Sequence, residues 1–125
     1  MTLNPAVDQT AWVDRLEPGR VHRVRETHID PAGKGINVSR MAHRLGWPTI
    51  AFGFLAGETG NIVRSALEAE GVQAHFGPVP GQTRINVTVV ERAGSASSFY
   101  GPGPAVPPDA LASLDGYIRF WLPAT

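Results

Sequence analysis

The sequence has no cysteine, a single lysine and no excess of either charge. Without cysteine, the chain can form neither a disulfide framework nor a zinc site with thiolate ligands, and it has no thiol nucleophile. Its eleven basic and eleven acidic residues cancel, whereas nucleic-acid-binding domains usually carry a clear basic excess. We therefore expect no nucleic-acid partner.

Long apolar runs are also missing. The longest mostly apolar stretch covers residues 48–56, which is less than half of the roughly 20 residues that a membrane-spanning helix needs. The N-terminus shows no basic region followed by an apolar stretch, which is the pattern of a secretory signal. The sequence thus predicts a cytoplasmic protein with no membrane partner.

What the sequence does contain suits a packed domain. Its 125 residues fit one ordinary domain, and the 42% of hydrophobic residues is close to the globular average. Fourteen glycines and eleven prolines together make one fifth of the chain, which stays below the range typical of low-complexity sequences. A single hydrophobic core is therefore expected.

Strand patterns and helix patterns alternate along most of the chain, which is typical of an α/β fold with a mainly parallel sheet covered by helices. Strands are expected at residues 49–55, 72–76, 83–92 and 96–100, a turn at 57–60, and helices at 36–45, 61–70 and from 107 onward. Gly46 and Gly71 stand where helix caps are expected. The apolar stripes at helical spacing are Val38, Met41, Ala42 and Leu45 in the first helix, Ile62, Val63, Ala66 and Leu67 in the second, and Leu111, Leu114, Tyr117, Ile118 and Trp121 in the third.

Two further extended stretches interrupt this alternation and predict a separate small sheet. They cover residues 12–13 and 20–29, with a turn signal at 17–19 between them. Arg20, Arg23 and Arg25 form a basic cluster in the second stretch. This cluster suits a ribbon that faces an anion, and it equally suits a solvated face.

The strongest local signal is Gly33-Lys34-Gly35, in a loop expected at residues 31–35, with Asn37 in the first turn of the helix that follows. Glycines allow the backbone to approach a ligand, and the N-terminus of a helix offers free N–H groups at the positive end of its dipole. The segment suits a polyol or an anion, and equally suits glycines that only serve tight packing. It lacks the spacing of a Walker A loop and the third glycine of the dinucleotide fingerprint.

Asp8 and Arg84 are the other candidates for ligand contacts. Asp8 is expected just beyond the end of a short first strand, where open α/β sheets place ligands and where a carboxylate can accept hydrogen bonds from hydroxyl groups. Arg84 is expected beside Asn86 on the polar face of a strand, where its guanidinium can grip a phosphate. The alternatives are a turn aspartate and an exposed strand arginine.

The usual catalytic motifs are missing. The sequence has no G-x-S-x-G nucleophile turn and no H-E-x-x-H motif, and its four histidines do not pair with carboxylates at metal-ligand spacing. We therefore predict no catalytic residue and no metal ligand in this chain.

These segments, in this order, resemble the PfkB family of carbohydrate kinases, which has the ribokinase-like fold. The resemblance is strongest to the branch that phosphorylates ketohexose phosphates, which comprises 1-phosphofructokinases and tagatose-6-phosphate kinases. It runs along nearly the whole chain, through residues 2–8, 19–24, 33–40, 45–46, 53–57 with Gly60, and 83–87.

The resemblance implies a role for each candidate residue. Asp8 and Asn37 would hold sugar hydroxyls, and Arg84 would bind the phosphate that the substrate already carries. Gly33, Lys34 and Gly35 would frame the sugar, and Arg20 and Arg23 would help to bind its phosphate. The implied reaction is phosphoryl transfer from ATP, with Mg²⁺, to fructose 1-phosphate or a related sugar phosphate.

The resemblance also implies an architecture. Residues 1–125 would be the N-terminal part of one kinase domain with a doubly wound sheet. A small β-sheet lid, with strands at approximately 10–30 and 83–100, would close over the sugar and pair with a second subunit to form a homodimer.

The sequence departs from the family pattern in places that affect these expectations. Ala32 stands where many relatives have glycine, and Thr88 stands where this branch commonly has lysine. The Gly-Ala-Gly-Asp motif, which supplies the catalytic base and part of the nucleotide-binding half in relatives, is not in the sequence. We therefore expect a sugar-binding part that is inactive alone. The alternatives are a stand-alone sugar-phosphate-binding or lid-type interaction module, and a gene fragment without function.

Overall fold

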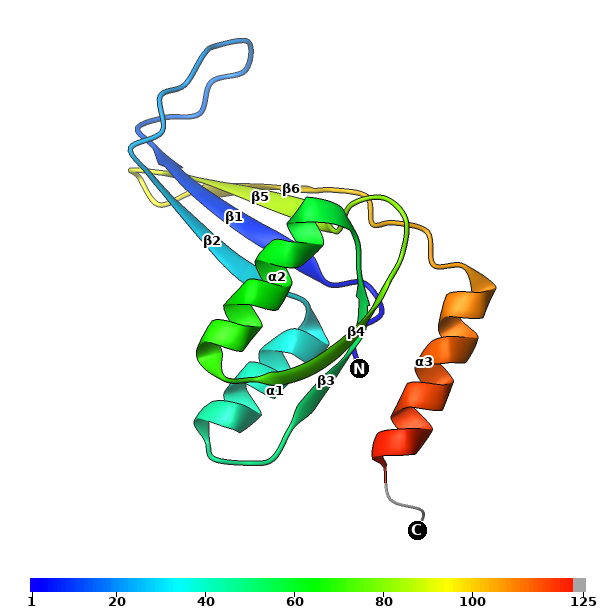
Figure 1. Ribbon diagram of the computed structural model, residues 1–125. Helices are drawn as coiled ribbons and strands as arrows, with labels where there is room; N and C mark the ends of the chain where they lie inside the picture. The colour runs from blue at the N-terminus through cyan, green and yellow to red at the C-terminus, as the bar shows by residue number, and fades with distance from the viewer. Residues whose placement is uncertain (123–125) are drawn as a thin grey trace.

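Two β-sheets and three α-helices make up residues 1–122, the part of the chain that the computed structural model describes (Figure 1). The strands are β1 (Ala6–Val13), β2 (Glu26–Ala32), β3 (Ile50–Leu55), β4 (Gln73–Pro78), β5 (Arg84–Glu91) and β6 (Ala96–Tyr100), and the helices are α1 (Lys34–Arg44), α2 (Gly57–Glu70) and α3 (Pro108–Trp121). The α/β class expected from the sequence is confirmed. None of the three helices combines the length and the apolar character needed to cross a membrane.

The larger sheet has four strands in the order β2-β1-β5-β6. Strand β1 runs parallel to β5, while the β1–β2 and β5–β6 pairs are antiparallel. The turn between β5 and β6 uses Gly94 at a φ of 99°, a left-handed conformation that favours glycine. The separate small sheet expected from residues 12–13 and 20–29 is only partly found, because β1 begins at Ala6, β2 begins at Glu26, and β5 and β6 belong to the same sheet.

The second sheet pairs β3 with β4 in parallel. Thr2 extends it by one bridge, because the Thr2 amide donates to the Phe52 carbonyl at 2.7 Å and Thr2 pairs with Gly53. The order across this sheet is therefore β4, β3 and then Thr2. No strand of residues 1–122 pairs with the far side of Thr2.

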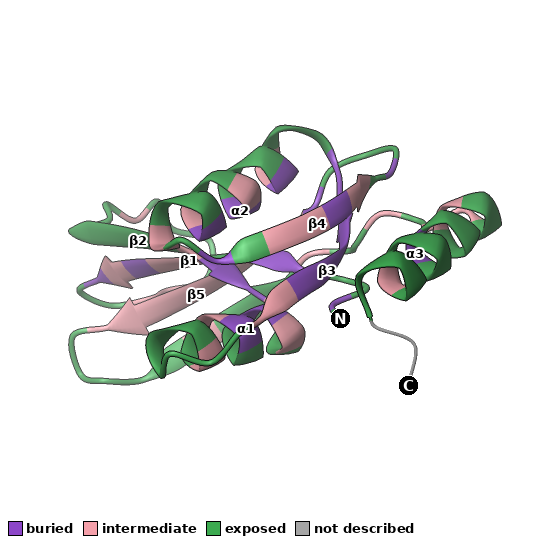
Figure 2. Cartoon of the chain, turned by 60° about the horizontal axis from the view of Figure 1, so that its bottom comes forward, coloured by how far each residue is buried: buried purple, intermediate pink, exposed green. Residues whose placement is uncertain are grey.

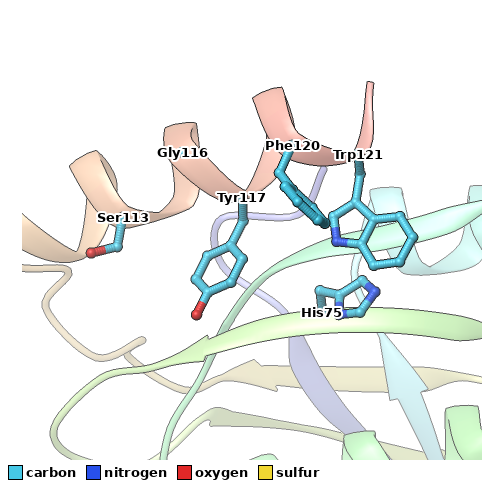
Figure 3. A pocket seen from close by; sticks show the side chains of 6 residues that line it. All are labelled: His75, Ser113, Gly116, Tyr117, Phe120 and Trp121. Carbon is cyan, nitrogen blue, oxygen red and sulfur yellow. The ribbon is translucent and has the colours of Figure 1, made fainter. Parts of the chain in front are cut away.

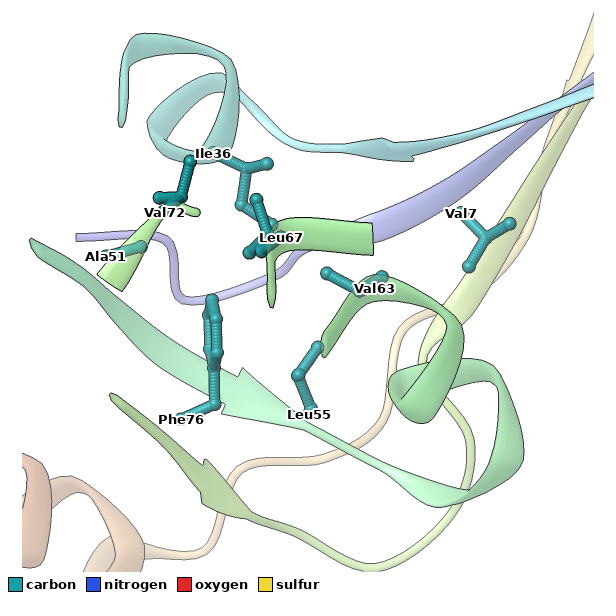
Figure 4. Close-up of a cluster of buried hydrophobic side chains, with 8 residues drawn as sticks. All are labelled: Val7, Ile36, Ala51, Leu55, Val63, Leu67, Val72 and Phe76. Carbon is teal, nitrogen blue, oxygen red and sulfur yellow. The ribbon is translucent and has the colours of Figure 1, made fainter. Parts of the chain in front are cut away.

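Helices cover both faces of the second sheet. The side chains of β3 alternate between these faces, so successive residues of β3 contact different helices. Leu55 packs with Val63 and Leu67 of α2, whereas Phe54 packs with Leu114 of α3. The first cluster is the main core (Figure 4), and its members are Val7, Ile36, Ala51, Leu55, Val63, Leu67, Val72 and Phe76. Because Val7 belongs to β1 and Ile36 to α1, this core also fixes the larger sheet to the helices.

Both helix ends predicted from glycine are confirmed. Gly46 and Gly71 have φ values of 78° and 76°. After each, the next amide reaches back into the helix: Trp47 donates to Ala42 and Val72 donates to Leu67. These bonds satisfy carbonyl groups that the helix itself leaves free.

Three boundaries predicted from the sequence are wrong. Residues 31–35 do not form a loop, because β2 runs through Ala32 and α1 begins at Lys34, so that Gly33 alone links them. Residues 57–60 are the first turn of α2 rather than a separate turn. Residues 20–25 lie outside any strand, and β2 begins only at Glu26.

The apolar stripe predicted for the first helix does not face the core. Val38, Met41 and Leu45 are exposed, and α1 buries Ile36 and Ser39 instead. The reason is the tight contact between the first turn of α1 and the segment before β1, which fixes the rotation of the helix. In α3 the predicted stripe is only partly covered, because Leu114 is buried while Leu111 and Tyr117 are exposed.

Candidate functional site

The predicted ligand-binding residues gather around the start of β1. Ala6 is the register partner of both Ala32 on β2 and Arg84 on β5. The end of β2, the start of α1 and the start of β5 therefore lie beside the first residues of β1. Because β1 and β5 are parallel, equivalent positions on them place their side chains on the same face of the sheet.

Asp8 lies inside β1, so the expectation that it follows the end of a strand is wrong. It is the register partner of Asn86 on β5, and its Oδ1 accepts a hydrogen bond of 2.9 Å from Asn86 Nδ2. The Asn86 Oδ1 atom is buried and has no hydrogen-bond partner in the described protein. The pair thus offers an acidic acceptor next to an unused amide acceptor.

Arg84 begins β5 beside this pair. One of its terminal nitrogens donates to the Asn4 carbonyl at 3.3 Å, while its Nε is buried without a partner. A buried donor without a partner costs about 1–3 kcal/mol, and more when the group is charged. An anionic ligand would supply the acceptor that this guanidinium lacks.

The glycines before and inside α1 allow close packing against the start of the chain. Gly33 has a φ of 126°, and a Cβ atom there would lie 3.3 Å from Pro5 Cα. A Cβ atom on Gly35 would collide with the Thr2 side chain and would lie 2.5 Å from the Met1 carbonyl oxygen. The tight-packing interpretation of these glycines is therefore supported by the structure, while a contact with substrate stays a prediction.

Lys34 and Asn37 are both exposed in the first turn of α1. The Asn37 amide donates to the Gly33 carbonyl at 2.9 Å, which is the first hydrogen bond of the helix. The amides of the three residues before Asn37 are those that a helix N-terminus leaves free. This end of α1 lies next to β1 through the contacts of Gly33 and Gly35.

Arg20 and Arg23 do not lie with the other candidates. The β1–β2 ladder ends at the Trp12–Glu26 pair, and both arginines are exposed in the long loop beyond it (Figure 1). This loop follows the end of β1, whereas Asp8 lies near the start of the same strand. Within one chain the structure does not bring these two arginines to Asp8, Asn86 and Arg84.

Two residues of the site were not singled out from the sequence. Asn4 accepts the hydrogen bond from Arg84, and Gly103 lies so close to Asn4 that a Cβ atom would collide with the amide group. The signal that could have found them is the repeated Gly-Pro pattern at residues 101–104, since glycine is typical of a close approach between segments. Gly101 is bonded in turn to β5, through its amide and the Ile85 carbonyl at 3.1 Å.

An ion-pair cluster lies where β2 passes into α1, and its Asp30 is the register partner of Asp8. Arg40 of α1 donates through Nε to both carboxylate oxygens of Glu70 on α2, at 2.8 and 3.0 Å, and lies 3.7 Å from Asp30 of β2. The hydrogen bond from Arg40 lowers the pKa of Glu70, and the same bond raises the pKa of Arg40. The cluster ties β2 and both helices together at the point where β2 passes into α1.

A separate hollow of the described surface lies away from these residues. It is an open, mostly apolar groove of about 600 Å³ between β4 and α3 (Figure 3), lined by His75, Ser113, Gly116, Tyr117, Phe120 and Trp121. The His75 ring stacks on Trp121 with a centroid distance of 4.8 Å and on Phe52 at 5.8 Å. None of the predicted ligand-binding residues lines this groove, so volume alone does not identify the site.

Residues 1–122 contain no cluster of three or more histidine, cysteine, aspartate or glutamate side chains that could hold a metal ion. A Cβ atom on Gly33 would meet Thr2 and Pro5, and one on Gly35 would meet Thr2 and Met1, so both glycines serve close packing. No step of a reaction is therefore assigned to ATP or Mg²⁺ on these residues.

Comparison with known proteins gives consistent matches. The sequence pattern of the pfkB family carbohydrate kinases matches residues 1–108. The 1-phosphofructokinase of Vibrio cholerae is 39% identical over 103 residues, which are 82% of this chain and 32% of that protein. The 1-phosphofructokinase of Haloferax volcanii is 42% identical over 95 residues, which are 75% of this chain and 31% of that protein.

The fold is similar to those of solved kinases as well. Phosphofructokinase-2 of Escherichia coli, in complex with fructose-6-phosphate, superposes with a TM-score of 0.88 and 29% identity, over 95% of this chain and 40% of that chain. A putative phosphofructokinase of Staphylococcus aureus gives the same TM-score over 94% of this chain and 38% of the other. The chain thus spans about a third of the length of the curated relatives that it matches.

Proposed function

The chain belongs to the PfkB family of carbohydrate kinases, and from that membership we propose that it forms the sugar-phosphate-binding part of an ATP-dependent ketohexose-phosphate kinase. The observation that carries this proposal is the group at the start of β1 and β5, where Arg84 Nε and Asn86 Oδ1 are buried without partners beside the Asp8 carboxylate. A sugar phosphate carries an anionic group that Arg84 can bind. It also carries hydroxyl groups that can donate hydrogen bonds to Asp8 and to the Asn86 Oδ1 atom. The 1-phosphofructokinase type, acting on fructose 1-phosphate, is the specific form that we propose.

Each residue has a defined task in this proposal. The Arg84 guanidinium binds the phosphate of the substrate, because its planar donors match phosphate oxygens. Asp8 accepts hydrogen bonds from sugar hydroxyls and is held in place by Asn86. Asn37 and the free amides at the N-terminus of α1, framed by Gly33, Lys34 and Gly35, hold the other side of the sugar.

We further propose that the four-stranded sheet acts as a lid and pairs with a second subunit. One row across it, Ile29, Gln9, Val87 and Phe99, joins all four strands on the face opposite to Asp8. Ile29 and Phe99 in this row are exposed apolar side chains. Closure of a lid excludes water, which would otherwise compete with the sugar hydroxyl for the phosphoryl group.

The dimer would also explain the position of two arginines. Arg20 and Arg23 lie at the far end of the sheet from Asp8, so they can assist a bound sugar phosphate only if that site belongs to another subunit. The proposal therefore includes substrate contact by these arginines, a homodimer and a cytoplasmic location.

ATP and Mg²⁺ belong, in this proposal, to the part of the kinase domain that relatives have beyond the length matched here. When bound, they supply the phosphoryl group and neutralise its developing charge. Residues 1–122 bind and orient the acceptor sugar. We therefore expect that the chain alone binds the sugar phosphate but gives no ATP-dependent product.

Isothermal titration calorimetry of the chain with fructose 1-phosphate tests this assignment. We expect Arg84→Ala to weaken binding by about tenfold or more, since a charge-assisted hydrogen bond contributes about 1.5–3 kcal/mol. Arg92→Ala is the matched control, because Arg92 follows the opposite end of β5 and pairs with Asp14 on the surface. Unchanged affinity in Arg84→Ala, or ATP-dependent phosphorylation of the sugar by the pure chain, would contradict the proposal.

A further inference from the structure

The long loop between β1 and β2, at residues 14–25, carries two arginines that the described part of the chain does not pair (Figure 1). We call residues 14–25 the arginine loop. Arg20 and Arg23 are exposed, and no ion pair or side-chain hydrogen bond in the described part of the chain uses either guanidinium. The other two arginines of the loop each pair with a carboxylate of the same loop, Arg15 with Glu17 and Arg25 with Asp14. Arg20 and Arg23 are therefore the guanidinium groups of this loop that can bind an anion from outside it.

Glu91, the last residue of β5, holds the first half of the arginine loop. Its Oε1 atom accepts a hydrogen bond of 2.7 Å from the Leu16 amide, and its other carboxylate oxygen accepts one from the Ser95 hydroxyl. The bonds from Ser95 and from the Leu16 amide lower the pKa of Glu91, so the carboxylate is charged at neutral pH. Leu16 and Glu91 are 75 positions apart, so this bond ties the loop to a distant part of the chain.

The other links between the loop and the end of β5 are exposed ion pairs. Asp14 and Arg92 are joined at 2.9 Å, but their side chains keep 70 and 69% of their accessible surface. Pairs of this kind contribute little to holding a segment in place, because water screens the charges. The half-buried Glu91, bonded to a backbone amide, is therefore the main restraint on this side of the loop.

His22 closes the tip of the arginine loop. Its Nε2 atom accepts a hydrogen bond of 2.9 Å from the Glu17 amide, and the Arg20 amide donates to the Glu17 carbonyl at 3.3 Å. Gly19, between these residues, has a φ of 73°, a left-handed conformation that favours glycine. Arg20 thus follows a defined turn, and Arg23 directly follows the histidine that closes it.

Two successive backbone amides of the loop, those of Leu16 and Glu17, are thus bonded to side chains. An exposed loop without such bonds would lose conformational freedom when its side chains bind a ligand, and this loss weakens affinity. A loop that already has its bound shape avoids most of it. The contacts of Glu91 and His22 therefore preorganise the two free arginines.

Strand β5 connects this restraint with the candidate site. Arg84 is its first residue and Glu91 is its last. The strand pairs with β1 on one side and β6 on the other, and it is half-buried along nearly its whole length (Figure 2). One strand that is paired on both sides therefore fixes the arginine loop relative to Arg84 and Asn86.

We propose that Glu91 is a positioning residue, which holds the arginine loop in the shape that presents Arg20 and Arg23 to the phosphate of a sugar phosphate bound by a second subunit. The proposal rests on the function proposed above, because the anion is the substrate of that function. Glu91 contacts no substrate itself and acts through the Leu16 amide. Its neighbour at the other end of β5, Arg84, binds the phosphate within its own subunit.

Amide hydrogen exchange, resolved for single residues by NMR, tests whether Glu91 holds the loop. In Glu91→Ala we expect the Leu16 amide to exchange about tenfold faster or more than in the wild-type chain, because it loses the carboxylate that accepts its hydrogen bond. Glu91→Gln should keep most of the protection, since the carboxamide oxygen can still accept this bond. Equal exchange of the Leu16 amide in the wild-type chain and in Glu91→Ala would overturn the proposal.

The matched control for this measurement is Glu68→Ala, because Glu68 is an exposed glutamate of α2. It removes the same side chain and charge and should leave the exchange of the Leu16 amide unchanged. The amide of Val63, which is fully buried in the main core, should exchange alike in all variants and shows that the fold is intact.

Titration calorimetry with fructose 1-phosphate tests whether Glu91 acts through the two arginines. Glu91→Ala should weaken binding by about fivefold, and the double variant Arg20→Ala/Arg23→Ala by at least as much. Adding Glu91→Ala to that double variant should then have no further effect, because the loop has no arginine left to position. A merely structural role of Glu91 would weaken binding in both backgrounds, so an equal further loss would overturn the proposal.

The same titrations separate this proposal from the proposed function. If Arg84→Ala weakens binding while the double variant Arg20→Ala/Arg23→Ala binds like the wild-type chain, the proposed function stands and the role of the arginine loop is refuted. If Arg84→Ala binds fructose 1-phosphate as tightly as the wild-type chain does, the proposed function itself fails, whatever the exchange of the Leu16 amide shows.

Discussion

At the scale of single residues, two of the three buried side-chain polar atoms without partners in residues 1–122 lie together at the candidate site. Arg84 Nε and Asn86 Oδ1 stand out because nearly all buried polar atoms in folded proteins are satisfied. Their separation by one strand residue places both on the face that carries Asp8. The third such atom, His75 Nε2, belongs to a residue that lines the apolar groove between β4 and α3, where a ligand would find few polar contacts.

The residue types of this site could be predicted from the sequence, whereas their contacts could not. Asp8 and Arg84 were candidates because a carboxylate can accept hydrogen bonds from hydroxyl groups and a guanidinium can bind a phosphate, although Asp8 lies inside β1 rather than beyond a strand end. The bond between Asp8 and Asn86 joins residues 78 positions apart and exists only because β1 pairs with β5 in parallel and in this register. Local patterns contain no information about such a register.

Gly35 gives a prediction at this scale. Gly35→Ala should lower the free energy of unfolding by about 1–3 kcal/mol, because the added methyl group collides with Thr2 and the Met1 carbonyl. Gly116→Ala is the matched control, since Gly116 is also helical but has open space around it. The control should be stabilised by about 0.5–1 kcal/mol. Urea denaturation measures both, and equal effects in the two variants would show that the contact with Thr2 does not constrain α1.

At the scale of elements, the sequence predicts the end of α1 correctly but not the side of α1 that is buried. The end of the helix at Gly46 is local chemistry and was predicted correctly. The buried side was predicted incorrectly, because the spacing of Val38, Met41 and Leu45 identifies an apolar side but not the layer that covers it. The side that faces the core is set instead by the close contact of Gly33 and Gly35 with the segment before β1.

The junction of α1, α2 and β2 should make stability depend on pH. Hydrogen bonding by Arg40 lowers the pKa of Glu70 below its ordinary value of 4.5, so the ion pair stabilises the fold above that value. This contribution is lost as the pH falls through the lowered pKa of the folded protein. Because the Arg40 and Glu70 side chains keep only 16 and 26% of their accessible surface, we expect Glu70→Gln to cost about 1–2 kcal/mol at neutral pH.

Urea denaturation across the acidic range measures this dependence. The difference between the wild-type chain and Glu70→Gln should shrink toward zero as the pH falls below the pKa of folded Glu70. Glu68→Gln is the control, since Glu68 is exposed on the same helix. A difference that stays constant with pH would mean that the pair contributes no charge interaction.

At the scale of the whole molecule, the two sheets expose two different apolar surfaces. One lies on α1, the helix before the second sheet, where Val38, Met41 and Leu45 are exposed. The other is the face of the four-stranded sheet with Ile29 and Phe99. Exposed apolar areas that are this well defined are typical of surfaces that bind other protein segments. The α/β class could be predicted from element order, but the strands of the four-stranded sheet and the identity of the uncovered surfaces required the three-dimensional arrangement.

Sedimentation velocity of the chain tests the proposed pairing of two lids. We expect Phe99→Glu to shift a dimer toward monomer, because Phe99 lies in the apolar row of the sheet. Tyr100→Glu is the matched control, since Tyr100 is the next residue of β6, is more exposed and points to the opposite face. A dimer that Tyr100→Glu dissolves and Phe99→Glu leaves intact would place the contact on the other face of the sheet.

The parallel pairing of β1 with β5 also has a consequence for how the chain acquires its structure. Strand β1 is complete at Val13, but its inner neighbour begins only at Arg84. During synthesis, about seventy residues must follow β1 before β5 exists and can pair with it. Pairings between such distant segments form slowly, and an unpaired strand exposed meanwhile is prone to aggregate. The group of Asp8, Asn86 and Arg84 is therefore among the last parts of the chain to form, and chaperones that shield β1 should raise the yield of folded protein.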